Sequence, residues 1–210
     1  MSVAPLAPSN LPPIADLQAM LAQIVGAPNV HADEARLRLH SEDIWKPADQ
    51  LAALIVAPAT TDELAQAVRA IAGAGCAIAP RGGGMSYTGG YVPTVARTVS
   101  IDTSRMDKIV RISREDMTVT VQAGVTWQAL NAALAPLKLR TPFWGPMSGL
   151  KSTIGGGVSQ LNAMFGAGHH GTTSESVVAL TVVLPNGQTL RTGARGPGGE
   201  TPFYLSLIHI

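Results

Sequence analysis

A glycine-rich segment at residues 80–90, Pro-Arg-Gly-Gly-Gly-Met-Ser-Tyr-Thr-Gly-Gly, carries the clearest chemical signal in the chain. Glycine has no Cβ, so its backbone reaches conformations closed to other residues and approaches a ligand closely. A loop of this kind presents backbone N–H groups in a concave nest, which suits a phosphate or pyrophosphate. Ser86 and Thr88 add hydroxyl donors, and Arg81 adds a fixed positive charge. The alternative is a flexible surface turn, but glycine-rich linkers usually contain much serine and do not follow an apolar segment directly.

A second glycine cluster, Ser-Thr-Ile-Gly-Gly-Gly at residues 152–157, has similar chemistry. Ser152 and Thr153 supply hydroxyl donors that a simple chain reversal does not need. Two such segments in one chain indicate that each holds a different part of one long ligand. The alternative is an irregular crossover at 142–157 with glycines at tight corners.

A third pattern, Gly-Ala-Gly-His-His-Gly at residues 166–171, matches the G-x-G-x-x-G motif of nicotinamide-binding folds. That motif follows a strand, opens a helix and has an acidic residue about 20 positions later. No strand is expected before Gly166, and Asp and Glu are absent between Glu175 and Glu200. We therefore reject this assignment. His169 and His170 are expected in an extended segment, where neighbouring side chains point in opposite directions and do not form a two-histidine metal site.

Composition excludes several classes of protein. The 210 residues carry a net charge of +1 with Lys and Arg scattered, so no nucleic-acid partner is expected. No apolar run approaches the roughly 18 residues of a transmembrane segment. Cys76 is the single cysteine and cannot form an internal disulfide, which predicts a reducing, cytoplasmic location. We interpret it as a small buried apolar residue.

Other polar and aromatic residues predict no further site. The segment with His31, His40, Glu42 and Asp43 matches no metal-ligand spacing, so no metal is predicted. The tryptophans are expected to be packing anchors rather than a stacking platform. They are Trp45, Trp127 and Trp144.

The first half of the chain predicts a strand–helix–strand unit. Apolar residues at helical spacing predict a helix over 16–25, and the apolar run 51–57 predicts a buried strand. Thr60 and Glu63 form a capping-box pattern at the start of the next helix. A strand over 76–79 follows, expected to pair in parallel with the first. The glycine loop would then lie at a carboxyl strand end, where open α/β sheets bind ligands.

The second half predicts short strands and one further helix. Thr126 is expected to cap a helix that continues to Leu134, and Pro185-Asn186-Gly187 predicts a hairpin turn with positive φ at both Asn and Gly. The expected strands are 98–101, 109–112, 117–121, 177–184 and 188–192. The predicted fold class is α+β, with a small parallel βαβ lobe followed by a mostly antiparallel lobe.

Four segments together resemble a known family. The loop 80–90 resembles the pyrophosphate loop of FAD-binding oxidoreductases of the vanillyl-alcohol oxidase and p-cresol methylhydroxylase type, which includes glycolate oxidase subunits and D-lactate dehydrogenases. Residues 54–63 resemble the opening strand and capped helix of that family, and residues 119–126 its Ala-Gly-Val turn. Residues 152–156, with Gly171 and 177–187, resemble its second flavin loop and closing hairpin. The order of the four segments makes the match specific.

The resemblance implies FAD as the cofactor, with its pyrophosphate in the first loop. It implies hydride transfer from an alcohol or 2-hydroxy acid to flavin N5. The alternative is a non-catalytic FAD- or nucleotide-binding subunit or module that needs a partner for the substrate site. The first-loop residues implied are Arg81, Gly82, Gly83, Gly84, Met85, Ser86 and Gly89. Ser152, Thr153, Gly155 and Gly156 would lie along the flavin, and Gly171 and Val178 near the pyrophosphate or adenine end.

The chain also departs from the family pattern. Some relatives attach the flavin through a histidine in the first loop, where this chain has Met85, Ser86 and Tyr87, so non-covalent binding is expected. We expect a lead-in and helix over 1–44, an incomplete FAD-binding domain over 45–204 and a non-native tail over 205–210. The family's substrate domain is expected to be absent, leaving this chain inactive alone. The substrate, the electron acceptor or partner subunit, and the catalytic residues stay open.

Overall fold

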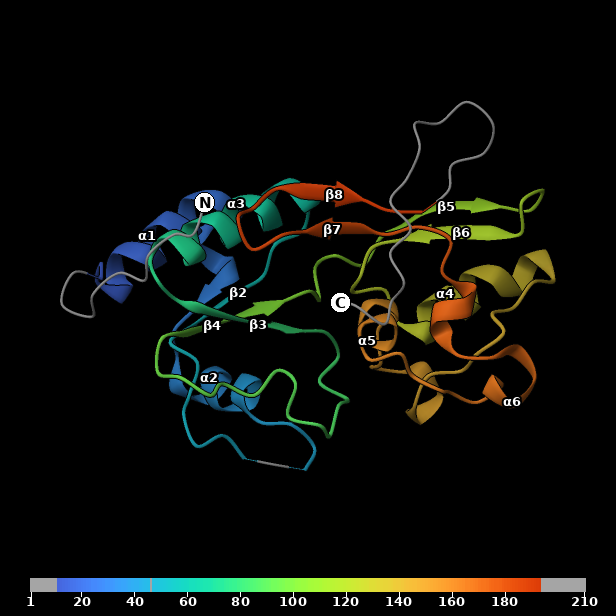
Figure 1. Ribbon diagram of the computed structural model, residues 1–210, viewed down its shortest axis with the longest axis horizontal. Helices are drawn as coiled ribbons and strands as arrows, with labels where there is room; N and C mark the ends of the chain where they lie inside the picture. Colours follow the sequence, from blue (N-terminus) through green and yellow to red (C-terminus); the bar gives the residue numbers. More distant parts are fainter. Residues whose placement is uncertain (1–10, 46, 194–210) are drawn as a thin grey trace. The chain divides into compact units, whose positions relative to one another are not determined.

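The computed structural model describes residues 11–45 and 47–193, and it forms two compact units (Figure 1). Of the described residues, the first unit contains those from 11 to 105 together with Leu184–Gln188, and the second contains Met106–Val183 and residues 189–193. The expected tail at 205–210 lies outside the described residues. The small parallel sheet and the antiparallel pairs confirm the predicted α+β class.

The first unit contains most of the chain's longer helices. Its elements are α1 (Ile14–Val25), the 3-10 helix η2 (Ala27–Asn29), β1 (Val30–His31), α2 (Glu34–Ser41), β2 (Leu54–Val56), α3 (Thr61–Gly73), β3 (Ala77–Arg81) and β4 (Thr98–Asp102). The segment before residue 45, expected as a lead-in and one helix, thus contributes α1, β1 and α2 to this unit.

The sheet of the first unit has the order β1-β2-β4-β3. Strands β2 and β3 are each parallel to β4, which lies between them, and β1 is antiparallel to β2. The predicted direct pairing of β2 with β3, and the assignment of 98–101 to the second lobe, are therefore wrong. Burial gives the reason: Val99, Ser100 and Ile101 are inaccessible on both faces, as a central parallel strand requires.

Helices cover both faces of this sheet. Figure 1 shows α1 and α3 on one side and α2 on the other. Helix α1 packs on α3 and β2 through the buried residues Leu17, Leu21 and Val25, which lie on one helical face. Helix α2 contacts β2 from the opposite side. With α2 packed on this face of the sheet, its C-terminal end lies near the end of β3, where the glycine loop begins.

Local interactions fix both ends of α3, and the cap at its start is the one that the sequence predicts. Thr60 Oγ1 accepts a hydrogen bond from Glu63 N at 3.1 Å. The Glu63 carboxylate accepts from Ala59 N at 2.8 Å, one residue earlier than in the usual capping box. At the other end Gly75 adopts φ +67°, which turns the chain toward β3. Cys76 is buried there, as expected.

The second unit is built from three short helices, three 3-10 turns and two antiparallel strand pairs among its described residues. Its elements are β5 (Ile109–Ser113), β6 (Thr118–Val121), α4 (Trp127–Leu134), η3 (Ala135–Leu137), η4 (Met147–Gly149), α5 (Ile154–Ser159), α6 (Ala167–His170), η5 (Thr173–Ser176), β7 (Thr181–Val183) and β8 (Thr189–Arg191). Thr126 Oγ1 accepts from Ala129 N at 3.1 Å, which confirms the predicted cap of α4. Helix α4 buries Leu130 and Leu134 against the β5–β6 pair.

The β7–β8 turn differs in type from the prediction. Gly187 has φ +75°, whereas Asn186 does not have a positive φ. Gly187 N donates to Leu184 O, and Leu184 N donates to Gln188 O, each at 2.8 Å. These bonds close a three-residue loop in which the glycine alone needs the left-handed conformation. Strand β7 is also shorter than the predicted 177–184.

The three tryptophans are not equivalent. Trp127 is 5% exposed and packs edge-on against Phe143 at 6.5 Å between ring centroids, as a packing anchor should. Trp45 is 83% exposed and Trp144 is 42% exposed, so the prediction is wrong for these two. Trp45 follows the end of α2, where no element covers it in the described structure. In the described part of the chain no helix is long and apolar enough to cross a bilayer.

Replacing Thr60 with Ala should lower the free energy of unfolding by about 1 kcal/mol, because the Glu63 N–H loses its acceptor at the start of α3. Replacing Thr60 with Ser keeps the hydroxyl and should leave stability close to wild type. Urea denaturation followed by circular dichroism measures both. Equal stability of the Ala and Ser variants would contradict a role for the cap.

Candidate functional site

The glycine loop begins where β3 ends, at the carboxyl end of a parallel strand. The N–H groups of residues 82–85 donate no hydrogen bond to any other described residue. In the second half of the loop, Thr88 N donates to Ser86 Oγ at 3.2 Å and Gly89 N donates to Asp43 Oδ2 at 2.6 Å. Within the described part of the chain, four consecutive backbone donors therefore remain without an acceptor. This arrangement fits a phosphate or pyrophosphate group.

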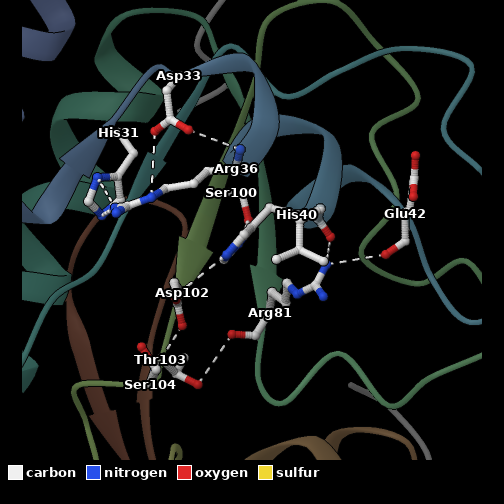
Figure 2. Close-up of polar contacts among 11 residues, drawn as sticks. His31, Asp33, Arg36, His40, Glu42, Arg81, Ser100, Asp102, Thr103 and Ser104 are labelled. Atoms are coloured by element: carbon white, nitrogen blue, oxygen red, sulfur yellow. Dashed lines mark hydrogen bonds and ion pairs between the residues drawn. The ribbon is translucent and has the colours of Figure 1, made fainter.

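Arg81 joins the start of the loop to the end of α2. Figure 2 shows its guanidinium beside that helix end, where Nη1 donates to Leu39 O at 2.6 Å and to Glu42 O at 3.2 Å. The same guanidinium lies 4.8 Å from the centroid of the Tyr91 ring. These carbonyls carry the negative end of the helix dipole, so a cation is stabilised there. Arg81 thus has a structural role in addition to the positive charge seen in the sequence.

His40 lies at the same corner, between α2 and β4. Its Nε2 lies 3.8 Å from Asp102 Oδ2, and its Nδ1 lies 3.5 Å from Ser100 Oγ (Figure 2). Burial lowers the pKa of His40 below its ordinary value; the Asp102 carboxylate opposes this, and Arg81 lowers the pKa further. His31 and Arg36 also act to lower the pKa of His40. Across the described residues, no group of three or more His, Cys, Asp or Glu side chains could hold a metal ion.

The second glycine cluster forms the start of α5. Thr153 caps this helix by accepting from Gly156 N at 3.2 Å, and Ser152 Oγ donates to Pro146 O at 3.3 Å. Both hydroxyl residues are buried. A Cβ on Gly155 would lie 2.7 Å from Ala123 Cβ, so this glycine is required for close packing. The alternative interpretation, glycine at a tight corner, accounts for Gly155 without a ligand.

The remaining predicted residues lie near α6. Gly171 ends α6 with φ +73°, and a Cβ there would collide with the Glu175 carboxylate. Val178 is exposed between η5 and β7. The rings of His169 and His170 lie 4.6 Å apart, so the predicted opposite orientation is wrong, because the segment is a helical turn rather than extended.

The surroundings of the 166–171 pattern differ from those of a nicotinamide-binding motif. Between β6 and β7 the described chain contains no strand, so the 166–171 pattern does not follow one. Its helix α6 has only four residues. The context that a dinucleotide fingerprint requires is therefore missing from this part of the chain.

The predicted residues fall into two groups. Arg81, the 82–86 segment and Gly89 belong to the first unit, and the other predicted residues belong to the second. Sequence reasoning missed the loop contacts of Asp43, which it considered only as a metal ligand. Its partner Gly89 is 46 positions away, and no local pattern connects them.

Comparison with known proteins identifies the class. Residues 52–193 match the family described as FAD binding domain. The chain is 29% identical over 198 residues to D-lactate dehydrogenase [cytochrome] 1, mitochondrial, of Saccharomyces cerevisiae, covering 90% of this chain and 33% of that protein. It is 31% identical over 180 residues to glycolate oxidase subunit GlcD of Bacillus subtilis, covering 86% of this chain and 38% of that protein.

Solved structures show the same fold. An alkyldihydroxyacetonephosphate synthase matches with a TM-score of 0.76 and 22% identity, covering 94% of this chain and 39% of that one. A p-cresol methylhydroxylase with substrate bound matches with a TM-score of 0.72 and 19% identity, at the same two coverages of 94% and 39%.

The chain belongs to the FAD-binding-domain family, and its fold is that of p-cresol methylhydroxylase. The resemblance drawn from the four sequence segments is confirmed, and FAD is the cofactor of this domain. The chain spans only 33% to 38% of the length of the two curated relatives named above.

Replacing Gly84 with Ala should weaken FAD binding about tenfold, because Gly84 has φ +66° and a Cβ would collide with the Arg81 guanidinium. Gly90→Ala is the matched control in the same loop, since its Cβ would meet only Thr88 Oγ1, at 3.7 Å. Isothermal titration calorimetry measures both affinities. Equal weakening by the two variants would show that the conformation of Gly84 is unimportant.

The lowered pKa of His40 predicts a pH dependence of stability. The folded state binds the His40 proton less well than the unfolded state does. Neutral His40 therefore contributes to the free energy of unfolding above the ordinary histidine pKa of about 6.5, and this contribution is lost as the pH falls through the lowered pKa. His40→Gln should remove it. Urea denaturation at about pH 8 and about pH 5 should show a smaller loss on acidification in the variant than in wild type. An identical loss in both would exclude His40 as the source.

Proposed function

We propose that this chain is the FAD-binding part of an oxidoreductase that oxidises an alcohol or a 2-hydroxy acid. In such a reaction the substrate carbon loses a hydride, its hydroxyl loses a proton, and a carbonyl forms. FAD, when bound, supplies the hydride acceptor at its N5 position. The relatives named D-lactate dehydrogenase and glycolate oxidase subunit support a 2-hydroxy acid as the substrate class.

The observation that carries the proposal is the run of N–H groups at residues 82–85, which have no acceptor among the residues that the structure describes. We propose that these groups bind the FAD pyrophosphate, with Arg81, Ser86 and Gly89 in the same loop. Backbone donors suit this ligand because they are fixed in direction and cost no side-chain entropy on binding. Arg81 adds a positive charge at the first position of the loop, held by α2.

The proposed contacts of the second unit follow the family pattern. Ser152, Thr153, Gly155 and Gly156 would lie along the flavin ring and ribityl chain, and Gly171 and Val178 near the pyrophosphate or adenine. The start of α5 would let the flavin approach the backbone closely, since Gly155 and Gly156 have no side chains. The packing role of Gly155 is compatible with this, because a glycine can serve both a tight contact and a ligand on its other side.

We propose that FAD is held without a covalent bond to the first loop. The side chains available there are Met85, Ser86 and Tyr87, and Ser86 Oγ lies 2.9 Å from Thr88 Oγ1. None of them is the histidine that attaches flavin in some relatives. The single buried Cys76 also offers no thiol for attachment and fits the reducing environment of the cytoplasm, where we place the protein.

The substrate site is proposed to lie outside this chain, whose FAD-binding domain we assign to residues 45–204. Relatives are about two to three times longer, as the shares of 33% and 38% indicate. We infer that the chain alone does not oxidise substrate. A second candidate is an FAD-binding subunit that needs a partner for the substrate site, which the relative named as a glycolate oxidase subunit favours.

Calorimetric titration of the chain with FAD and with NAD⁺ tests the proposal. FAD should bind at least about tenfold more tightly, although both ligands contain adenine and a pyrophosphate, because the second unit lacks a nicotinamide fingerprint. Acid precipitation should then release all of the flavin into the supernatant. Equal affinities, or no binding of FAD, would overturn the proposed function; flavin retained in the pellet would overturn non-covalent binding.

A further inference from the structure

The carboxylate of Asp43 bridges the end of α2 and the glycine loop. Its Oδ2 accepts from Gly89 N at 2.6 Å, and its Oδ1 accepts from Trp45 N at 2.8 Å. A charged acceptor makes a shorter and stronger hydrogen bond to a backbone N–H than a neutral one does. We propose that Asp43 is a positioning residue, which fixes the loop in the shape that receives the FAD pyrophosphate. This inference rests on the proposed site at residues 82–85.

The bond from Asp43 is one of several that join the same two segments. Near the start of the loop, Arg81 donates to Leu39 O and Glu42 O. In its middle, Ile44 N donates to Ser86 O at 3.2 Å. The Asp43 bond to Gly89 fixes the far end. Residues 39–44 therefore hold the loop at three points, and the segment 82–85 lies between the first and the second.

The loop needs this external support. Glycine loses more conformational entropy on ordering than any other residue, and the loop contains five glycines. Among the described residues, Thr88 N donates to Ser86 Oγ within the loop, and Val92 N, just beyond the loop, donates to Gly89 O at 3.1 Å. Fixing the loop before FAD arrives reduces the entropy lost on binding.

The charge of Asp43 also indicates positioning rather than ligand binding. A carboxylate repels a pyrophosphate, so direct contact between the two would weaken affinity. Both carboxylate oxygens already accept backbone N–H groups on the α2 side of the loop. Because the Gly89 N–H is already bonded to Asp43, the N–H groups of residues 82–85 are the loop donors that we propose for the ligand.

Three variants separate positioning from general stability. Asp43→Ala removes the acceptor. Asp43→Asn keeps one oxygen, which we expect to face Gly89 because the Trp45 N–H lies in an exposed segment and can bond to water. Asp33→Ala is the matched control at the opposite end of α2, where Asp33 caps the helix by accepting from Arg36 N at 3.1 Å. It weakens the same helix without touching the loop.

Hydrogen–deuterium exchange of the Gly89 amide, measured by NMR without ligand, gives the first result. Asp43→Ala should speed exchange about tenfold or more relative to wild type, because the N–H loses a charged acceptor. Asp43→Asn and Asp33→Ala should stay within about threefold of wild type. Unchanged exchange in Asp43→Ala, or an equal increase in Asp33→Ala, would overturn the inference.

Affinity for FAD and for riboflavin, measured by calorimetry, gives the second result. Asp43→Ala should weaken FAD binding about tenfold and leave riboflavin binding unchanged, because riboflavin has no pyrophosphate; Asp43→Asn should restore most of the loss. A parallel loss for both ligands would contradict a role at the pyrophosphate. If wild type binds no FAD, the proposed function fails, and exchange at Gly89 alone then decides whether Asp43 fixes the loop.

Discussion

The first unit depends on one constraint: a loop rich in glycine cannot hold its own shape. Its order has to come from residues outside it, because glycine carries no side chain to pack and the largest entropy to lose. Arg81 reaches the carbonyls at the end of α2, and Thr103 N donates to Arg81 O at 3.0 Å from the end of β4. The helix and the central strand thus hold the residue from which the loop departs.

The parts of this fold that the sequence predicted are those encoded within a few residues. Thr60 and Thr126 each cap a helix because the acceptor and its N–H are three positions apart. The insertion of β4 between β2 and β3 was not predictable in the same way, since strand order depends on contacts between distant segments. The Asp43 contact with Gly89 also joins residues far apart in the chain, so it could not be predicted from the sequence. The sequence therefore located the loop but not the residues that fix its conformation.

Glycine identity alone does not distinguish a binding loop from a packing site. Gly84 and Gly89 have positive φ, a conformation that other residues adopt only at a cost. Gly155 and Gly157 lie in α5 with ordinary helical geometry, and a Cβ on Gly157 would lie 2.7 Å from Met164 Cε. The two clusters look alike in sequence because both consist of residues without a Cβ. The 80–90 loop needs glycine for its backbone conformation, whereas the 152–157 cluster needs glycine because a Cβ would collide with neighbouring atoms. The family match covers both clusters, because it extends over residues 52–193, and it assigns no separate role to either of them.

The electrostatics of the loop follow from the same corner of the fold. Burial and the guanidinium of Arg81 both lower the pKa of His40, so the imidazole is favoured in its neutral form. Arg81 then supplies the fixed positive charge at this corner, held between the α2 carbonyls and the Tyr91 ring. Since a guanidinium does not lose its proton in the physiological range, this charge does not vary with pH. The lowered pKa of His40 and the charge of Arg81 thus belong to the same corner of the first unit.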